Sequence, residues 1–180
     1  MRVLFNTLVV LSLCGAVASC GHRPNDDRGN LETLWRMGER STAVTEARAI
    51  VLRAANANEV DPHELVRRAG AIRDRLYSEP VPPVDARGAR PDLRFVVDGG
   101  QLDAELRDAL LHDDALVMIR AAITVGELGL RRHAIGLLDV ITRPGPVTLN
   151  QPTADLETPR IAWLTAKQVA LESLAQLAAP

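Results

Sequence analysis

The stretch VMIRAAITVGELG, residues 117–129, decides the fold of this 180-residue chain. It is apolar nearly all round a helix, and its polar side chains Arg120, Thr124 and Glu127 fall on one narrow stripe at helical spacing. Such a helix has to be covered by other elements on most of its sides. A second stretch of similar pattern, AKQVALESLAQLA, occupies residues 166–178, so that Ala121 matches Ala170 and Gly126 matches Ala175.

The two stretches resemble the helices of HEAT-like repeats of the short bacterial kind, in which an Arg-Ala-Ala run leads to Leu-Gly-x-Leu-Gly. The resemblance covers roughly residues 102–177 and implies an all-α fold, with helical hairpins stacked as a short HEAT-like α-solenoid. An irregular helical bundle is the alternative. Small residues such as Gly126 suit this packing because they let stacked helices approach closely. The intervening residues 143–160 are too many for a tight repeat, and they are either an insertion or a degenerate unit.

Helical patterns also fill residues 30–77, which we interpret as an N-terminal helical hairpin region. Gly38 and the Ser41-Thr42 pair are expected to separate a short first helix from a longer second one. Asp61 followed by Pro62 predicts the start of a further helix, because Asp caps free amides and Pro suits the first helical position. Leu65, Ala69, Ile72 and Leu76 form the apolar stripe of that helix.

Residues 78–100 are rich in Pro and Gly, and this composition predicts a linker between the hairpin region and a repeat region at 101–180. Residues 93–97 are expected to be extended, and Gly99-Gly100 is interpreted as a turn. In the repeat region, His112-Asp113-Asp114 is expected to end one helix and cap the next. Gly129 is a stop signal, and a further amphipathic helix is predicted for residues 131–142. Aromatic residues are only 3% of the chain, so the core is expected to consist of aliphatic side chains and Ala.

The N-terminal sequence MRVLFNTLVVLSLCGAVASC has one early positive charge, a short apolar run and then small residues. This is the form of a signal peptide, assigned to residues 1–19. Its apolar run is shorter than the roughly 20 residues needed to cross a bilayer. Residues 20–29 are polar and are interpreted as a flexible tether.

The end of this segment, Val17-Ala18-Ser19-Cys20, resembles the lipobox of bacterial lipoproteins. The resemblance implies that the chain is cut before Cys20, that the thiol carries diacylglycerol, and that the new amino terminus is acylated, for example with palmitate. Several acyl chains anchor a protein stably. Gly21 in place of Asp implies the periplasmic face of the outer membrane if the organism has two membranes. The alternative is ordinary cleavage after Ala18 or Ser19 with a free Cys20. Loss of Cys14 with the signal peptide would exclude an internal disulfide.

No catalytic, cofactor-binding or metal-binding constellation is recognisable. The histidines at 22, 63, 112 and 133 fit no zinc motif, His133 is expected to be partly exposed, and no nucleophile elbow occurs. Of the 21 basic residues 20 are Arg, and Lys167 is the only Lys; a general compositional bias accounts for this. The net charge of −2 and the absence of a basic cluster argue against a nucleic-acid partner.

We therefore expect a non-enzymatic lipoprotein that is anchored to the cell envelope through acylated Cys20 and serves as a scaffold or interaction module for another envelope protein. Two alternatives stay open. One is an enzyme or enzyme-accessory factor, since HEAT-like repeats also occur in bilin lyases. The other is a structural envelope protein that binds lipid or peptidoglycan.

Overall fold

The computed structural model describes residues 24–78, 99–145 and 159–180. Within these residues the protein consists of seven α-helices and one 3₁₀ turn, with no strand, so the all-α prediction is confirmed. The signal peptide, Cys20 and the expected extended segment 93–97 lie outside the described residues. The elements are α1 (Pro24–Arg36), α2 (Arg40–Ala57), α3 (Pro62–Ser78), α4 (Gly99–Leu110), α5 (Ala115–Glu127), η1 (Arg131–His133), α6 (Ala134–Thr142) and α7 (Pro159–Ala178).

Several boundaries differ from the sequence-based expectation. Helix α1 begins at Pro24, so the second half of the expected tether at 20–29 is helical. Ser41 and Thr42 lie inside α2, and the break before it is made by Gly38, whose φ of 84° is a left-handed conformation that favours glycine. Gly99 and Gly100 open α4 instead of forming a turn.

The predicted helix signals of α3 and α5 are confirmed. The backbone N–H of His63 donates to Oδ1 of Asp61 at 3.0 Å, and Pro62 is the first residue of α3. Asp114 is the N-cap of α5, and its side chain accepts from the N–H of Leu116 at 2.8 Å. At the other end of α5, Gly129 has a φ of 63°, which ends the helix as expected.

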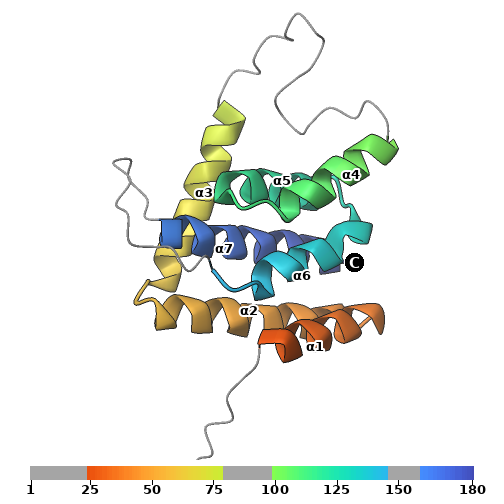
Figure 1. Cartoon of the computed structure of the whole chain (residues 1–180), viewed down its shortest axis with the longest axis horizontal. Coiled ribbons are helices and arrows are strands. Elements are labelled where there is room, and N and C mark those ends of the chain that lie inside the picture. Colours follow the sequence, from red (N-terminus) through yellow and green to blue (C-terminus); the bar gives the residue numbers. More distant parts are fainter. Residues whose placement is uncertain (1–23, 79–98, 146–158) are drawn as a thin grey trace, which may run out of the picture.

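The helices form three stacked hairpins, and Figure 1 shows them one above another. Helices α1 and α2 form the lowest hairpin in this view, α6 and α7 the middle one, and α4 and α5 the highest. Neighbouring hairpins contact each other through both of their helices: α6 lies between α1 and α4, and α7 lies between α2 and α5. The spatial order of the hairpins therefore differs from their order in the chain.

Helix α7 is the centre of the molecule, because α2, α3, α5 and α6 all pack against it. Its buried residues lie on nearly every side of the helix, from Trp163 to Leu177. Helix α3 runs across the stack in Figure 1 and is tied to α7 by an ion pair between Arg73 and Glu172. The largest fully buried side chains are Leu31, Leu65, Leu106, Leu110, Met118, Ile119, Leu137, Leu138, Ile141, Leu174, Val125 and Val140. The core is thus mainly aliphatic, as expected.

The two stretches that were matched in the sequence lie in α5 and α7, which pack directly on each other. They approach closely at Gly126, where an added Cβ would lie 3.0 Å from the Cβ of Ser173. Because Gly126 and Ser173 are both near the C-terminal ends of their helices, α5 and α7 run in the same direction. Helix α2 runs in the opposite direction, since Ala55 near its end clusters with Leu164 near the start of α7.

No helix in the described part of the chain combines the length and apolar character that a membrane crossing requires.

Candidate functional site

A cavity with chemically diverse walls lies where the ends of α2 and α6 meet the start of α7. We call it the Trp163 pocket; its volume is about 560 Å³. The cavity is lined by Asp27, Ile50, Arg53, Ala54, Ala57, Asn58, Thr142, Arg143, Pro144, Gly145, Arg160, Trp163, Leu164 and Lys167. One wall is apolar, and four of the remaining side chains are cationic while one is a carboxylate.

Lys167 is the most unusual residue of this pocket, because it is a charged group that is only 5% exposed. Its Nζ donates to the carbonyl oxygens of Ile141 and Arg143, both at 2.6 Å, and to that of Val140 at 3.3 Å. These carbonyls belong to the C-terminal end of α6, where the helix leaves acceptors unpaired and where a positive charge is favourable. Lys167 therefore caps α6 from the middle of α7.

Burial lowers the pKa of Lys167 from 10.5 to about 8, and the neighbouring charge of Arg143 acts in the same direction. The amine is therefore protonated at neutral pH and has three N–H donors for its three carbonyls. A guanidinium is planar and directs its donors in a fixed fork, so it does not suit three acceptors that converge on one point. This geometry explains why one Lys occurs in a chain that otherwise uses Arg.

Because Lys167 is the only Lys, its burial can be followed by amine chemistry. We expect an amine-reactive acylating reagent to leave Lys167 unmodified in the native protein at pH 8 and to modify it rapidly in denaturant. The measurement is intact mass after a short labelling pulse, with the site assigned by peptide mass spectrometry. Equally fast labelling of Lys167 in the native and the unfolded chain would contradict the buried position.

Arg143 connects three helices at the same pocket. Its Nη2 donates to the carbonyl of Leu111 at 2.8 Å and its Nη1 to that of His112 at 3.3 Å, both just beyond α4. Its guanidinium also lies 5.8 Å from the centroid of the Trp163 ring, within the range of a cation–π contact. Arg143 thus fixes the end of α4 and the indole ring that forms the pocket wall.

The Nε1 atom of Trp163 is buried and has no hydrogen-bond partner in the described part of the chain. The residue as a whole is only 6% exposed. Buried indole N–H groups usually find an acceptor, because an unpaired one loses the hydrogen bond it makes with water. Two other lining residues, Arg53 and Asp27 of α1, pair with each other at 3.3 Å. Arg160 is exposed and forms no ion pair with any other described residue.

A second polar cluster joins α4 to η1. Asp103 accepts from Nε of Arg132 at 2.7 Å and from Nε2 of His133 at 2.8 Å. The bond from His133, followed by that from Arg132, lowers the pKa of Asp103. His133 is 7% exposed, so the expectation that it is partly exposed was wrong. The sequence pattern missed this pairing because the two residues are 30 positions apart. The cluster contains no nucleophile and lies beside a smaller cavity of about 290 Å³.

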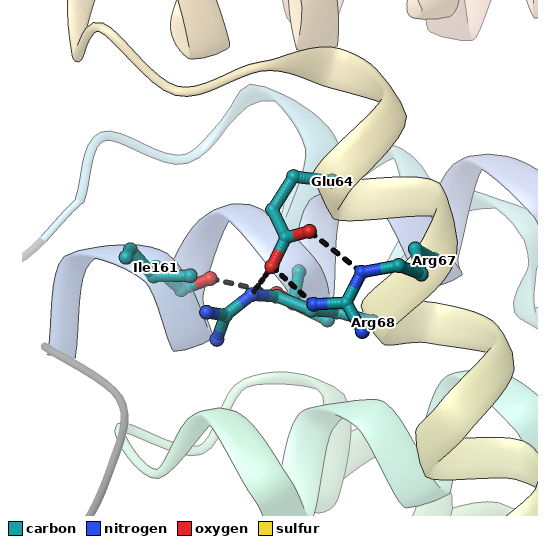
Figure 2. A network of polar contacts seen from close by, with 5 residues as sticks. Glu64, Arg67, Arg68 and Ile161 are labelled. Atoms are coloured by element: carbon teal, nitrogen blue, oxygen red, sulfur yellow. Dashed lines mark hydrogen bonds and ion pairs between the residues drawn. The ribbon is translucent and has the colours of Figure 1, made fainter.

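A third polar cluster lies at the start of α3. Figure 2 shows Glu64 between Arg67 and Arg68, with Ile161 of α7 nearby. The carboxylate accepts from Nε and Nη2 of Arg67 at 2.7 and 2.6 Å, and from Nε of Arg68 at 2.6 Å. The hydrogen bonds from Arg67 and then Arg68 lower the pKa of Glu64 from 4.5 to about 2. The position of Glu64 in the first turn also suits the positive end of the helix.

This lowered pKa predicts an acid-dependent contribution to stability. Because the folded-state pKa of Glu64 lies below its unfolded value, the contribution is fully present above about pH 4.5 and is lost as the pH falls toward about 2. We expect Glu64→Gln to lower the urea midpoint modestly at pH 6 and to have no effect near pH 2. A difference between wild type and variant that stays constant over this range would contradict the pairing.

The structure does not place the one site residue predicted from the sequence, Cys20, which lies outside the described residues. His112 follows the end of α4, where its Nδ1 accepts from the N–H of Asp114 at 2.9 Å, so this segment is a cap as expected. In the described residues, no group of three or more His, Cys, Asp and Glu side chains is arranged to hold a metal ion. The Trp163 pocket was not predicted, because its charged residues come from α1, α2, α7 and the end of α6, which are distant in the sequence.

No protein-family model matches this sequence, and comparisons with curated proteins and with solved structures found no significant match.

Proposed function

We propose that the protein is a lipoprotein of the cell envelope, anchored through Cys20, whose stacked helical hairpins serve as a binding module for another envelope protein. The observation that carries the proposal is the sequence Val17-Ala18-Ser19-Cys20 at the end of an apolar leader. If the organism has two membranes, we propose that the protein is attached to the periplasmic face of the outer membrane, because Gly21 and not Asp follows the cysteine.

The position of α1 supports an anchor close to the folded body. Helix α1 begins at Pro24, and an extended chain from Cys20 to Pro24 spans at most about 14 Å. The start of α1 would therefore lie near the bilayer surface. The stacked hairpins would then present α2 through α7 to other molecules at that surface.

The polar groups of the described residues favour binding over catalysis. Lys167 caps α6, Asp103 joins η1 to α4, and Glu64 pairs with two arginines of its own helix. Each of these groups has a structural partner. The helices also form stacked hairpins, and the sequences of α5 and α7 resemble those of HEAT-like repeats. Such stacks commonly bind proteins along their extended surfaces.

The partner can be sought by crosslinking in the native host. We expect the wild-type chain to be recovered in the membrane fraction and to crosslink to one or a few envelope proteins. The matched control is Cys20→Ala, which should be lost from the acylated membrane pool and should lose these crosslinks. Recovery of wild type and Cys20→Ala in the same fraction, with the same crosslinks or with none, would contradict the proposal.

A further inference from the structure

We propose that the Trp163 pocket is a binding site for an amphiphilic anion, that is, a carboxylate or phosphate group carried on an apolar chain. Only its placement at a membrane surface rests on the proposed function.

The charge of the pocket selects an anion. Among the described residues, its walls contain Arg53, Arg143, Arg160 and Lys167 and one carboxylate, Asp27, in a chain whose net charge is −2. Asp27 is paired with Arg53, and the ammonium of Lys167 is held by carbonyls. Arg160 has no ion pair with a described residue and stands in the first turn of α7, which contains no acid. An anion beside Arg160 would be attracted both by the guanidinium charge and by the positive end of the α7 dipole.

The indole of Trp163 supplies a second and independent observation. Its Nε1 is a buried donor without an acceptor, and Trp163 is one of the residues that form the pocket wall. The ring edge faces Gly145, where an added Cβ would lie 3.3 Å from Cδ1 and 3.5 Å from Nε1. Gly145 also lines the pocket. The N–H has no exposed surface in the ligand-free protein, so Gly145 has to shift away from the ring edge before a ligand oxygen becomes its acceptor.

The apolar part of the pocket lining favours an anion that carries an apolar chain. Ile50, Ala54 and Ala57 of α2 and Leu164 of α7 form the apolar part of the lining. The pocket volume of about 560 Å³ falls within the range of roughly 300–1,000 Å³ that is typical of small-molecule sites. A bare inorganic ion would fill little of this volume and leave the apolar wall in contact with water. An anion with an aliphatic chain matches both halves of the pocket.

The location of the pocket agrees with this ligand class if Cys20 is acylated. Asp27 lines the pocket and lies in the first turn of α1, so the pocket is close to the point at which the chain reaches the anchor. Amphiphilic anions are concentrated at a bilayer surface, as free fatty acids or as anionic phospholipids. Both sources present the same chemistry to Arg160 and Trp163.

The test uses the fluorescence of Trp163. The chain has two tryptophans, so Trp35→Phe leaves Trp163 as the only one. The acylated full-length mature protein with this change, held in phosphatidylcholine vesicles, is titrated with octanoate. We expect a saturable change in the Trp163 emission, and about a tenfold weaker Kd when Arg160→Gln is added. Arg120→Gln is the matched control, because Arg120 is exposed on α5, which contributes nothing to the pocket.

Further titrations decide the ligand class and its source. Octyltrimethylammonium and acetate should each bind at least tenfold more weakly than octanoate. A change of Trp163 emission on moving to phosphatidylglycerol vesicles without octanoate would identify the lipid headgroup as a source, whereas a response to octanoate alone would identify free fatty acid. Calorimetric titration of the protein with both tryptophans should give the same Kd, which guards against an effect of Trp35→Phe on folding.

The proposal is overturned if octanoate causes no saturable change, if the cationic analogue binds equally well, or if Arg120→Gln weakens binding as much as Arg160→Gln. Failure of octanoate binding by a protein whose Cys20 is shown by mass to be acylated would reject the pocket and leave the lipoprotein proposal intact. Octanoate binding by a protein whose Cys20 is found not to be acylated would support the pocket and reject the lipoprotein proposal.

Discussion

Replacing Lys167 with Met is expected to lower the free energy of unfolding by about 2–4 kcal/mol at pH 7. Met keeps much of the side-chain volume, so the loss arises from the three carbonyls at the end of α6 that lose their common donor. Buried acceptors without a partner are costly, and a cation at a helix C-terminus is favourable. The measurement is urea denaturation followed by circular dichroism, with Arg120→Met as an exposed control that should change the stability by less than about 0.5 kcal/mol.

Comparison of wild type with Lys167→Met at several pH values gives a second test, because the direction in which their stability difference changes with pH is known. The pKa of Lys167 is about 8 in the folded protein and lies below the ordinary value of 10.5. Between these two pH values the unfolded chain binds more protons, so the wild type gains stability as the pH rises through this window. Lys167→Met removes the titrating group, so its disadvantage relative to wild type should grow from pH 8 to pH 10. A difference that shrinks would contradict the buried position of the amine.

Replacing Gly126 with Val is expected to destabilise the protein by about 2–3 kcal/mol, since overpacked contacts cost roughly this amount. The backbone of α5 approaches α7 so closely here that an added Cβ would lie 2.4 Å from Oε1 of Gln176 and 3.0 Å from Cβ of Ser173. The Gln176 amide is the far end of a flexible side chain and can move away, but the Ser173 Cβ is fixed to its helix. The two helices would therefore have to separate.

Gly70→Val is the matched control for this prediction. Gly70 lies inside α3, and an added Cβ there would meet nothing within 4 Å. Val has a somewhat better helix propensity than Gly, so the expected change is between zero and about 0.5 kcal/mol of stabilisation. Thermal denaturation of both variants at one pH makes the comparison. Equal destabilisation at the two positions would show that the close approach of α5 and α7 at Gly126 does not set the effect.

The sequence predicts the helices best where their burial is most complete. Residues 117–129 and 166–178 are apolar on most sides, and they form the two helices at the centre of the packing, α5 and α7. Local cap chemistry was equally informative at Asp61 and Asp114, because such signals depend only on neighbouring residues. The start of α1 was missed because the polar residues after Pro24 have no apolar period.

The order of stacking could not be predicted from the sequence. An amphipathic face shows that a helix is covered but does not identify the partner, so nothing in the pattern of α2 indicates that it packs on α7. The Trp163 pocket could not be predicted for the same reason, because the sequence does not show which helices meet there. Lys167 binds backbone carbonyls that are 24 to 27 positions away, and backbone groups leave no signature in the side-chain sequence. The signal that was available is compositional: the only Lys of an Arg-rich chain occurs within an apolar helix.

The most direct test of the lipoprotein assignment is the intact mass of the protein isolated from membranes of its native host, compared with Cys20→Ala. We expect a wild-type chain that begins at Cys20, with a mass increased by a diacylglycerol and an N-terminal acyl chain, and a variant without these additions. An unmodified wild-type chain, or one that keeps residues 1–19, would contradict it.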